Sequence, residues 1–112
     1  MSIHVSTHPL IKHKLTVLRN VETSAHDFRA VMKEMTFYLG YEATRDLALT
    51  TETVTTPLGT TTGSKLASSI AIIPILRAGL GMGDALLELI PKATVHHIGK
   101  FNMGCENSRM KI

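Results

Sequence analysis

The segment from Ile70 to Leu89 places the strongest constraint on how this chain of 112 residues can fold. A run of isoleucine and alanine over residues 69–75 predicts a short strand buried on both faces of a parallel sheet. The Arg-Ala-Gly sequence at 77–79 predicts a turn, and residues 84–90 predict a helix. This order of strand, turn and helix is typical of an α/β fold.

The residues after this segment predict a second parallel strand. Pro91 ends the helix because proline cannot donate a backbone hydrogen bond. Residues 93–99, which include Val95 and Ile98, can then pair beside the first strand after a right-handed crossover.

Two amphipathic helices are expected before the sheet. Pro9 suits a first helical position, and apolar residues recur at helical spacing over residues 10–19. Ser24 stands three residues before Asp27, which predicts a capped helix start with an acid near its positive end. One apolar stripe follows, and residues 41–49 can extend this helix.

Residues 50–62 contain eight threonines, which predict two β-strands rather than a helix. Pro57 and Gly59 fit a tight turn between these strands. The polar composition indicates an exposed hairpin arm.

The turn at Arg77, Ala78 and Gly79 is the best candidate for a binding site. Ligands of open parallel sheets bind beyond the carboxyl ends of the strands, where a helix also points its positive end. Glycines at 79, 81 and 83 would let the backbone approach a ligand, and Arg77 can hold phosphate oxygens with its planar fork. The alternative is that the glycines only permit a tight turn and that Arg77 is a solvated surface charge.

Other motifs are incomplete. The dinucleotide pattern G-x-G-x-x-G has Asp84 in its last glycine position, and Ser64 precedes Lys65 where a P-loop needs lysine first. The histidine pairs at 4 and 8 and at 96 and 97 have no matching ligand spacing, so a metal site is not expected.

Composition excludes several other classes. The net charge of +3 is spread along the chain, without the basic cluster of a nucleic-acid or membrane-surface protein. The single cysteine, Cys105, excludes an internal disulfide and fits a reducing compartment. The first ten residues lack a secretory signal pattern, so a soluble cytoplasmic protein is expected.

Three stretches together resemble one family. They are His-Pro-Leu-Ile-Lys-His-Lys-Leu at 8–15, Tyr-Glu-Ala-Thr at 41–44 and Pro-Ile-Leu-Arg-Ala-Gly-Leu-Gly-Met at 74–82. In this order they resemble the N-terminal half of uracil phosphoribosyltransferase, from about residue 3 to residue 101. The last stretch is highly specific to that family.

The resemblance implies part of a type I phosphoribosyltransferase fold, with N-terminal helices, a hairpin arm and the start of a parallel sheet. It implies the transfer of phosphoribose from phosphoribosyl diphosphate, bound with Mg²⁺, to uracil N1, which yields UMP and diphosphate. Arg77, Ala78 and Gly79 match the family's pyrophosphate loop. No catalytic residue and no metal ligand is assigned here, and a homo-oligomer is expected of the intact protein.

Two departures from the family divide the chain into residues 1–101 and a divergent tail, 102–112. Phe101 is followed by Asn102, where family members carry arginine, and the tail is not expected to form the family's charged hairpin. A changed reading frame or altered splicing could produce such a tail.

The sequence also ends before the family's Asp-Pro-Met-Leu-Ala-Thr-Gly-Gly-Ser type loop for the ribose phosphate and before its uracil-reading segment. The chain alone is therefore expected to be inactive. The alternatives are a noncatalytic module that binds a full-length partner through the family's dimer surface, and a general phosphate-binding domain.

Overall fold

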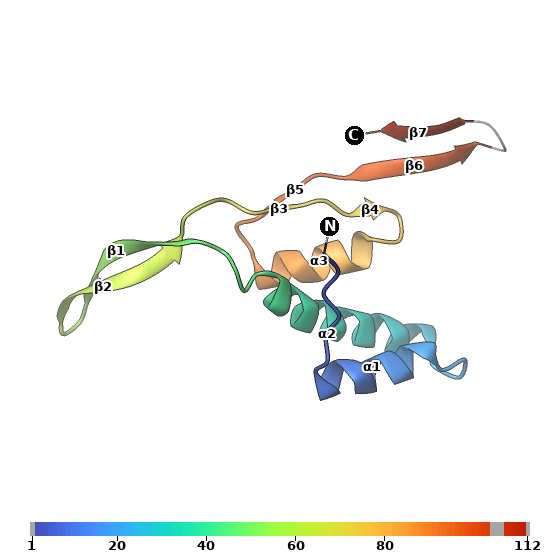
Figure 1. The fold of residues 1–112 in the computed structure, drawn as a ribbon, viewed down its shortest axis with the longest axis horizontal. Helices are drawn as coiled ribbons and strands as arrows, with labels where there is room; N and C mark the ends of the chain where they lie inside the picture. The colour runs from blue at the N-terminus through green and yellow to red at the C-terminus, as the bar shows by residue number, and fades with distance from the viewer. Residues whose placement is uncertain (1, 104–106, 112) are drawn as a thin grey trace.

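The computed structural model describes the backbone of residues 2–103 and 107–111, and the side chains of residues 2–99. The elements in chain order are α1 (Pro9–Arg19), α2 (Ala25–Ala43), β1 (Leu49–Thr56), β2 (Gly59–Leu66), β3 (Ala71–Ile72), β4 (Ile75–Leu76), α3 (Leu80–Leu89), β5 (Thr94–Val95), β6 (Ile98–Met103) and β7 (Asn107–Lys111). The helices α1, α2 and α3 lie on the same side of strands β3 to β6, and the β1–β2 hairpin extends outward as an arm (Figure 1).

Helices α1 and α2 begin where the sequence predicts. Pro9 is the first residue of α1. At the start of α2 the Ser24 hydroxyl accepts a hydrogen bond of 3.1 Å from the Asp27 amide, which satisfies one of the free N–H groups of the first turn. Both predicted starts are confirmed.

The predicted extension of α2 through residue 49 is wrong. The helix ends at Ala43, and the Thr44 hydroxyl donates to the Gly40 carbonyl at 2.8 Å, which occupies a carbonyl of the last turn. Residues 44–46 form a turn, and Leu49 already belongs to β1. Leu49 pairs with Leu66 of β2, and the Ala67 amide donates to the Ala48 carbonyl at 2.9 Å, so strand pairing at the end of this segment overrides its helical propensity.

The hairpin arm is confirmed, with strands longer than the threonine-rich segment. β1 and β2 are antiparallel, and Thr56 lies opposite Gly59, so Pro57 and Leu58 form the loop. Gly59 has φ of +139°, a backbone conformation that side-chain-bearing residues rarely adopt. Its place at the end of the turn therefore depends on its being glycine.

The parallel sheet is present, but the predicted continuous strand over 69–75 is wrong. β3 pairs in parallel with β5, and β4 pairs in parallel with β6. Ile72 and Pro74 are buried, whereas Ile73 is 52% and Ile75 61% exposed. The segment is therefore two short strands whose residues alternate between buried and exposed, and α3 packs against β3.

Two further boundaries differ from the prediction. Helix α3 begins at Leu80 rather than at residue 84, since Gly79 takes the N-cap position. The strand predicted over 93–99 is divided, because the exposed residues His96 and His97 separate β5 from β6. β6 then pairs antiparallel with β7, so the backbone of the tail does form a hairpin.

The core lies between α2 and α3. Thr36 and Ala85 are each 1% exposed, and Met35 from the apolar stripe of α2 is 7% exposed. A β-carbon built on Gly40 would lie 2.5 Å from Leu86 Cδ2, so glycine at this position allows the two helices to approach closely. No helix of the described residues is long and apolar enough to cross a membrane.

Candidate anion-binding turn

The Arg77–Gly79 turn joins the carboxyl end of β4 to the first residue of α3. Arg77 and Ala78 are exposed, and Gly79 is half-buried. The Arg77 guanidinium therefore remains accessible to a ligand, on a turn that two packed elements hold in place. The peptide bond between Leu76 and Arg77 is cis.

Gly79 holds the turn together rather than opening it to a ligand. Its N–H donates a 2.8 Å hydrogen bond to the Ile75 carbonyl. A β-carbon at this position would lie 2.8 Å from the Ile75 nitrogen and 2.9 Å from the Ile75 oxygen. Glycine is thus required because the backbone of Ile75 lies against it.

The three glycines of this segment consequently have different roles. A β-carbon on Gly83 would lie 3.1 Å from Pro74 Cγ, so this residue lets α3 pack closely on the chain before β4. A β-carbon on Gly81 would meet nothing within 4 Å. The prediction that all three glycines open the backbone to a ligand is therefore wrong for Gly79 and Gly83, and only Gly81 leaves open space.

The first turn of α3 presents N–H groups near Arg77. Two of its amides are used within the chain, since Leu80 donates to Arg77 O at 3.1 Å and Gly83 to Gly79 O at 2.8 Å. Across the part of the chain that the structure describes, the Gly81 and Met82 amides donate no such hydrogen bond. These two donors and the positive helix end can attract an anion. The sequence pattern predicted a helix end here, but not which amides stay free.

A shallow groove of about 470 Å³ lies beside the turn, between α2 and α3. Ala78 and Gly81 belong to its wall. Lys33 from α2 does not provide a second free cation, because its Nζ lies 2.9 Å from both carboxylate oxygens of Glu88. Arg29 from α2 also lines the groove, whereas Arg77 is the cation on the adjoining turn itself.

The other residues singled out in the sequence do not join this site. Lys65 lies on the arm, where its Nζ is 3.7 Å from a Glu52 carboxylate oxygen. Cys105 falls outside the described residues. Within residues 2–103 and 107–111, no group of three or more His, Cys, Asp or Glu side chains could hold a metal ion.

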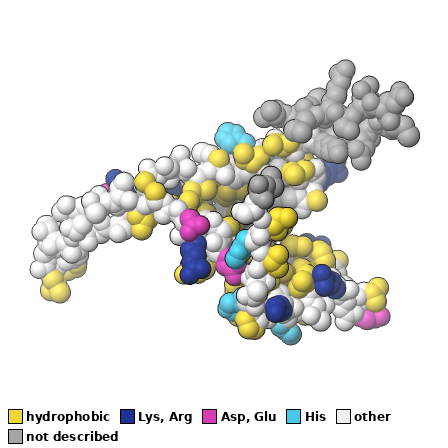
Figure 2. All heavy atoms as spheres, viewed as in Figure 1, with side chains coloured by type: hydrophobic (Ala, Val, Ile, Leu, Met, Phe, Trp, Pro, Cys, Tyr) yellow, Lys and Arg dark blue, Asp and Glu magenta, His cyan; other side chains and the backbone are white. Residues whose placement is uncertain are grey.

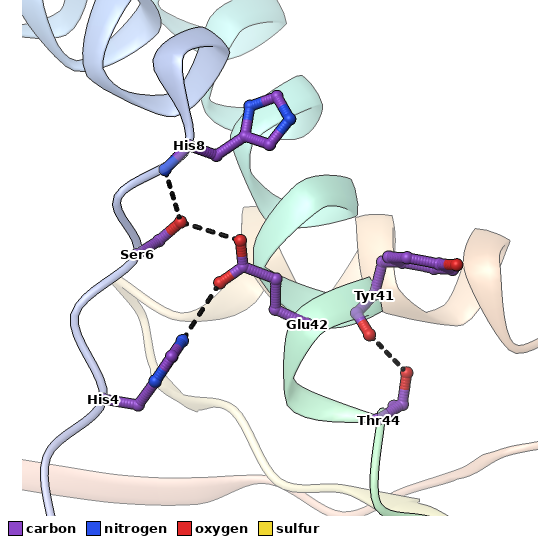
Figure 3. Close-up of polar contacts among 6 residues, drawn as sticks. All are labelled: His4, Ser6, His8, Tyr41, Glu42 and Thr44. Carbon is purple, nitrogen blue, oxygen red and sulfur yellow. Dashed lines mark hydrogen bonds and ion pairs between the residues drawn. The ribbon is translucent and has the colours of Figure 1, made fainter.

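A second polar cluster was not anticipated from the sequence. Glu42, near the end of α2, accepts a 2.8 Å hydrogen bond from the Ser6 hydroxyl and lies 3.3 Å from His4 Nε2 (Figure 3). These contacts lower the pKa of Glu42, chiefly through the Ser6 hydroxyl. They fasten the N-terminal segment to α2 across more than 30 positions of sequence, which no local pattern could reveal.

Comparisons with known proteins identify the family of this chain. A family model described as uracil phosphoribosyltransferase matches residues 5–108, so the match extends past Phe101 into the tail. A curated uracil phosphoribosyltransferase of Burkholderia ambifaria is 46% identical over 101 residues, covering 89% of this chain and 47% of that protein. One from Thermosipho africanus is 49% identical over 100 residues, covering 88% and 48%.

The fold of the chain also matches a solved structure. A protein from Aquifex aeolicus aligns over all of this chain and 54% of its own length, with a TM-score of 0.85 and 37% identity. This chain thus spans about half the length of the curated relatives it matches. The family match over most of the chain and the shared α/β fold show that this chain belongs to the uracil phosphoribosyltransferase family.

Proposed function

We propose that this chain serves uracil phosphoribosyl transfer, in which uracil and phosphoribosyl diphosphate yield UMP and diphosphate. The names of the curated relatives support the reaction. The observation that carries the proposal is the exposed Arg77 next to the unpaired Gly81 and Met82 amides at the start of α3. This chain would hold the diphosphate end of the substrate.

The proposed chemistry uses these groups at the leaving group. As uracil N1 bonds to the anomeric carbon and gives up its proton to water, the bond from that carbon to the diphosphate oxygen breaks with its electron pair on the oxygen, and negative charge grows on the diphosphate. Arg77 can stabilise this charge with two parallel N–H donors. The amides of α3 add donors that are already oriented, so little reorganisation accompanies the reaction.

Mg²⁺ is proposed to arrive with the substrate rather than to reside in this chain. The described residues do not form a ligand set for a metal ion. Mg²⁺ often keeps several waters and binds through substrate phosphates. We therefore assign no ligand and no reaction step to a resident metal.

Diphosphate binding tests the role of the turn. Calorimetry with Mg²⁺-diphosphate should show binding by the chain and a loss of roughly tenfold or more for Arg77→Ala, since a hydrogen bond to a charged group contributes about 1.5–3 kcal/mol. Arg19→Ala, at the end of α1, is the matched control. Equal affinities for the two variants would reduce Arg77 to a surface charge.

Turnover is a separate measurement. Incubation of the chain with labelled uracil, phosphoribosyl diphosphate and Mg²⁺ should give little UMP, because the turn holds only the diphosphate and other groups must hold the ribose phosphate and uracil. Rapid UMP formation by this chain alone would contradict that expectation.

A noncatalytic role is the second candidate. The arm supports it, because Leu58 at the arm's tip is fully exposed and Leu49 at its base is 62% exposed. In this role the arm and helices would bind a full-length relative or form a homo-oligomer. Sedimentation of the chain with the Thermosipho africanus relative should then reveal a species that contains both proteins. Separate sedimentation boundaries for the two proteins at all concentrations would exclude this noncatalytic role. The expected cytoplasmic location and the tail boundary at residue 101 stay predictions.

A further inference from the structure

The groove between α2 and α3 adjoins the Arg77 turn. Figure 1 shows that the two helices run side by side in the same direction, so both begin on the side of this turn. Arg29 in the second turn of α2 and Asp84 in the second turn of α3 line the groove together with Gly81 and Met82. The groove therefore brings charged side chains of two helices to the residues that carry the free amides of α3.

The charged side chains around the groove differ in whether they have a partner. On the face drawn in Figure 2, most charged side chains lie over the helical part of the molecule and few over the arm. Further along the groove, Lys33 and Glu88 pair at 2.9 Å, so their charges offset each other. Among the side chains of residues 2–99, no ion pair involves Arg29 or Asp84. Arg29 is also exposed, so its guanidinium donors remain available to a ligand.

The charge of Asp84 makes a second cation necessary for an anion at this end of the groove. A diphosphate at the Gly81 and Met82 amides would lie within about one helical turn of the Asp84 carboxylate, and like charges at such distances repel. Arg29 faces the same groove and can offset this repulsion. A planar guanidinium fork holds one phosphate group at a time, so Arg77 alone leaves the other phosphate group without a cation.

We infer that Arg29 is a second cation of the diphosphate site, which holds one phosphate group from α2 while Arg77 holds the other from the turn, and that Asp84 competes with the ligand for the Arg29 guanidinium. This inference rests on the proposed function, because it concerns the same ligand at the same turn. The site then consists of one cation from the turn, one from α2 and the oriented amides of α3.

Calorimetry of the full chain with Mg²⁺-diphosphate and with inorganic phosphate tests Arg29. Arg29→Ala should weaken diphosphate binding roughly tenfold or more, but phosphate binding less than about twofold, because a single phosphate group needs only Arg77. Arg29→Lys keeps the charge and loses the fork, so it should recover part of the affinity. Arg45→Ala, in the turn after the other end of α2, is the matched control and should bind as the unmodified chain does.

Asp84→Asn gives a prediction of opposite sign. It removes the carboxylate that repels the anion and competes for Arg29, so diphosphate should bind about threefold more tightly or better. If the two residues only formed a structural ion pair, Asp84→Asn and Arg29→Ala would weaken binding alike, and that result would overturn the inference. Circular dichroism checks the fold of each variant. Asparagine has nearly the size of aspartate, so this variant keeps the test decisive even if Arg29→Ala does not fold.

The pattern across the variants separates this inference from the proposed function. If Arg77→Ala loses affinity while Arg29→Ala binds diphosphate as the unmodified chain does, the inference is refuted and the proposed role of Arg77 is retained. If Arg29→Ala loses affinity while Arg77→Ala does not, Arg29 is supported as a ligand contact and the proposed function loses the observation that carries it. No diphosphate binding by the unmodified chain would refute both.

Discussion

Replacing Gly79 by alanine should destabilise the chain through a steric effect at the turn. Gly79 has φ of −79° and ψ of −7°, which alanine adopts without strain. The added methyl group would lie 2.8 Å from Ile75 N, 2.9 Å from Ile75 O and 3.2 Å from Pro74 Cβ. Ordinary contacts begin near 3.4 Å, so the turn must open by several tenths of an ångström.

The expected loss follows from two contributions. Overpacking of this kind costs about 1–3 kcal/mol, and opening the turn weakens the 2.8 Å hydrogen bond from Gly79 N to Ile75 O, which contributes about 1 kcal/mol. The free energy of unfolding should therefore fall by about 2–4 kcal/mol. That is a large part of the roughly 5–15 kcal/mol typical of a domain.

Gly81→Ala is the matched control, two residues further on. Nothing lies within 4 Å of its β-carbon position, and the residue is in α3, so alanine should stabilise the helix by up to about 1 kcal/mol. Urea unfolding followed by circular dichroism compares the two variants. Their midpoints should differ by about 1 M or more, with the slope unchanged. Unfolding free energies within about 0.5 kcal/mol of each other would refute this account of the turn.

Three further substitutions test other elements. Gly59→Ala should destabilise the arm, because alanine is strained at φ of +139°. Faster hydrogen exchange of the arm amides in the variant would reveal this loss, and unchanged exchange would contradict the expected strain. The lowered pKa of Glu42 means that its contacts with Ser6 and His4 stabilise the fold above the ordinary carboxyl pKa of 4.5 and are lost as pH falls through the lower, folded value. Glu42→Gln should therefore reduce the loss of stability in acid, and identical acid titrations of both proteins would argue against this contact. Thr36→Val should cost about 1 kcal/mol in urea unfolding, because it removes a buried hydroxyl that donates to a carbonyl of its own helix at 2.8 Å, and a gain in stability would contradict that role.

Local sequence signals determined where several elements begin and turn. Pro9, Ser24 and Asp27 act within one helical turn of themselves, so the starts of α1 and α2 were predictable. The threonine-rich arm and its turn at Pro57 and Gly59 were predictable for the same reason. The family-specific run at 74–82 also placed the Arg77–Gly79 turn correctly between a strand and a helix.

Only the tertiary structure decided which strand residues are buried and which glycines are required by close packing. In the sequence the run over 69–75 is apolar at successive positions, so it does not show which side chains are covered; in the structure α3 packs against β3, and Ile72 is buried while Ile73 is exposed. Gly79 and Gly83 share a motif with Gly81, yet they face the backbone of Ile75 and the ring of Pro74. Burial and close approach depend on residues distant in the sequence or brought near by a turn, and such contacts leave no local pattern.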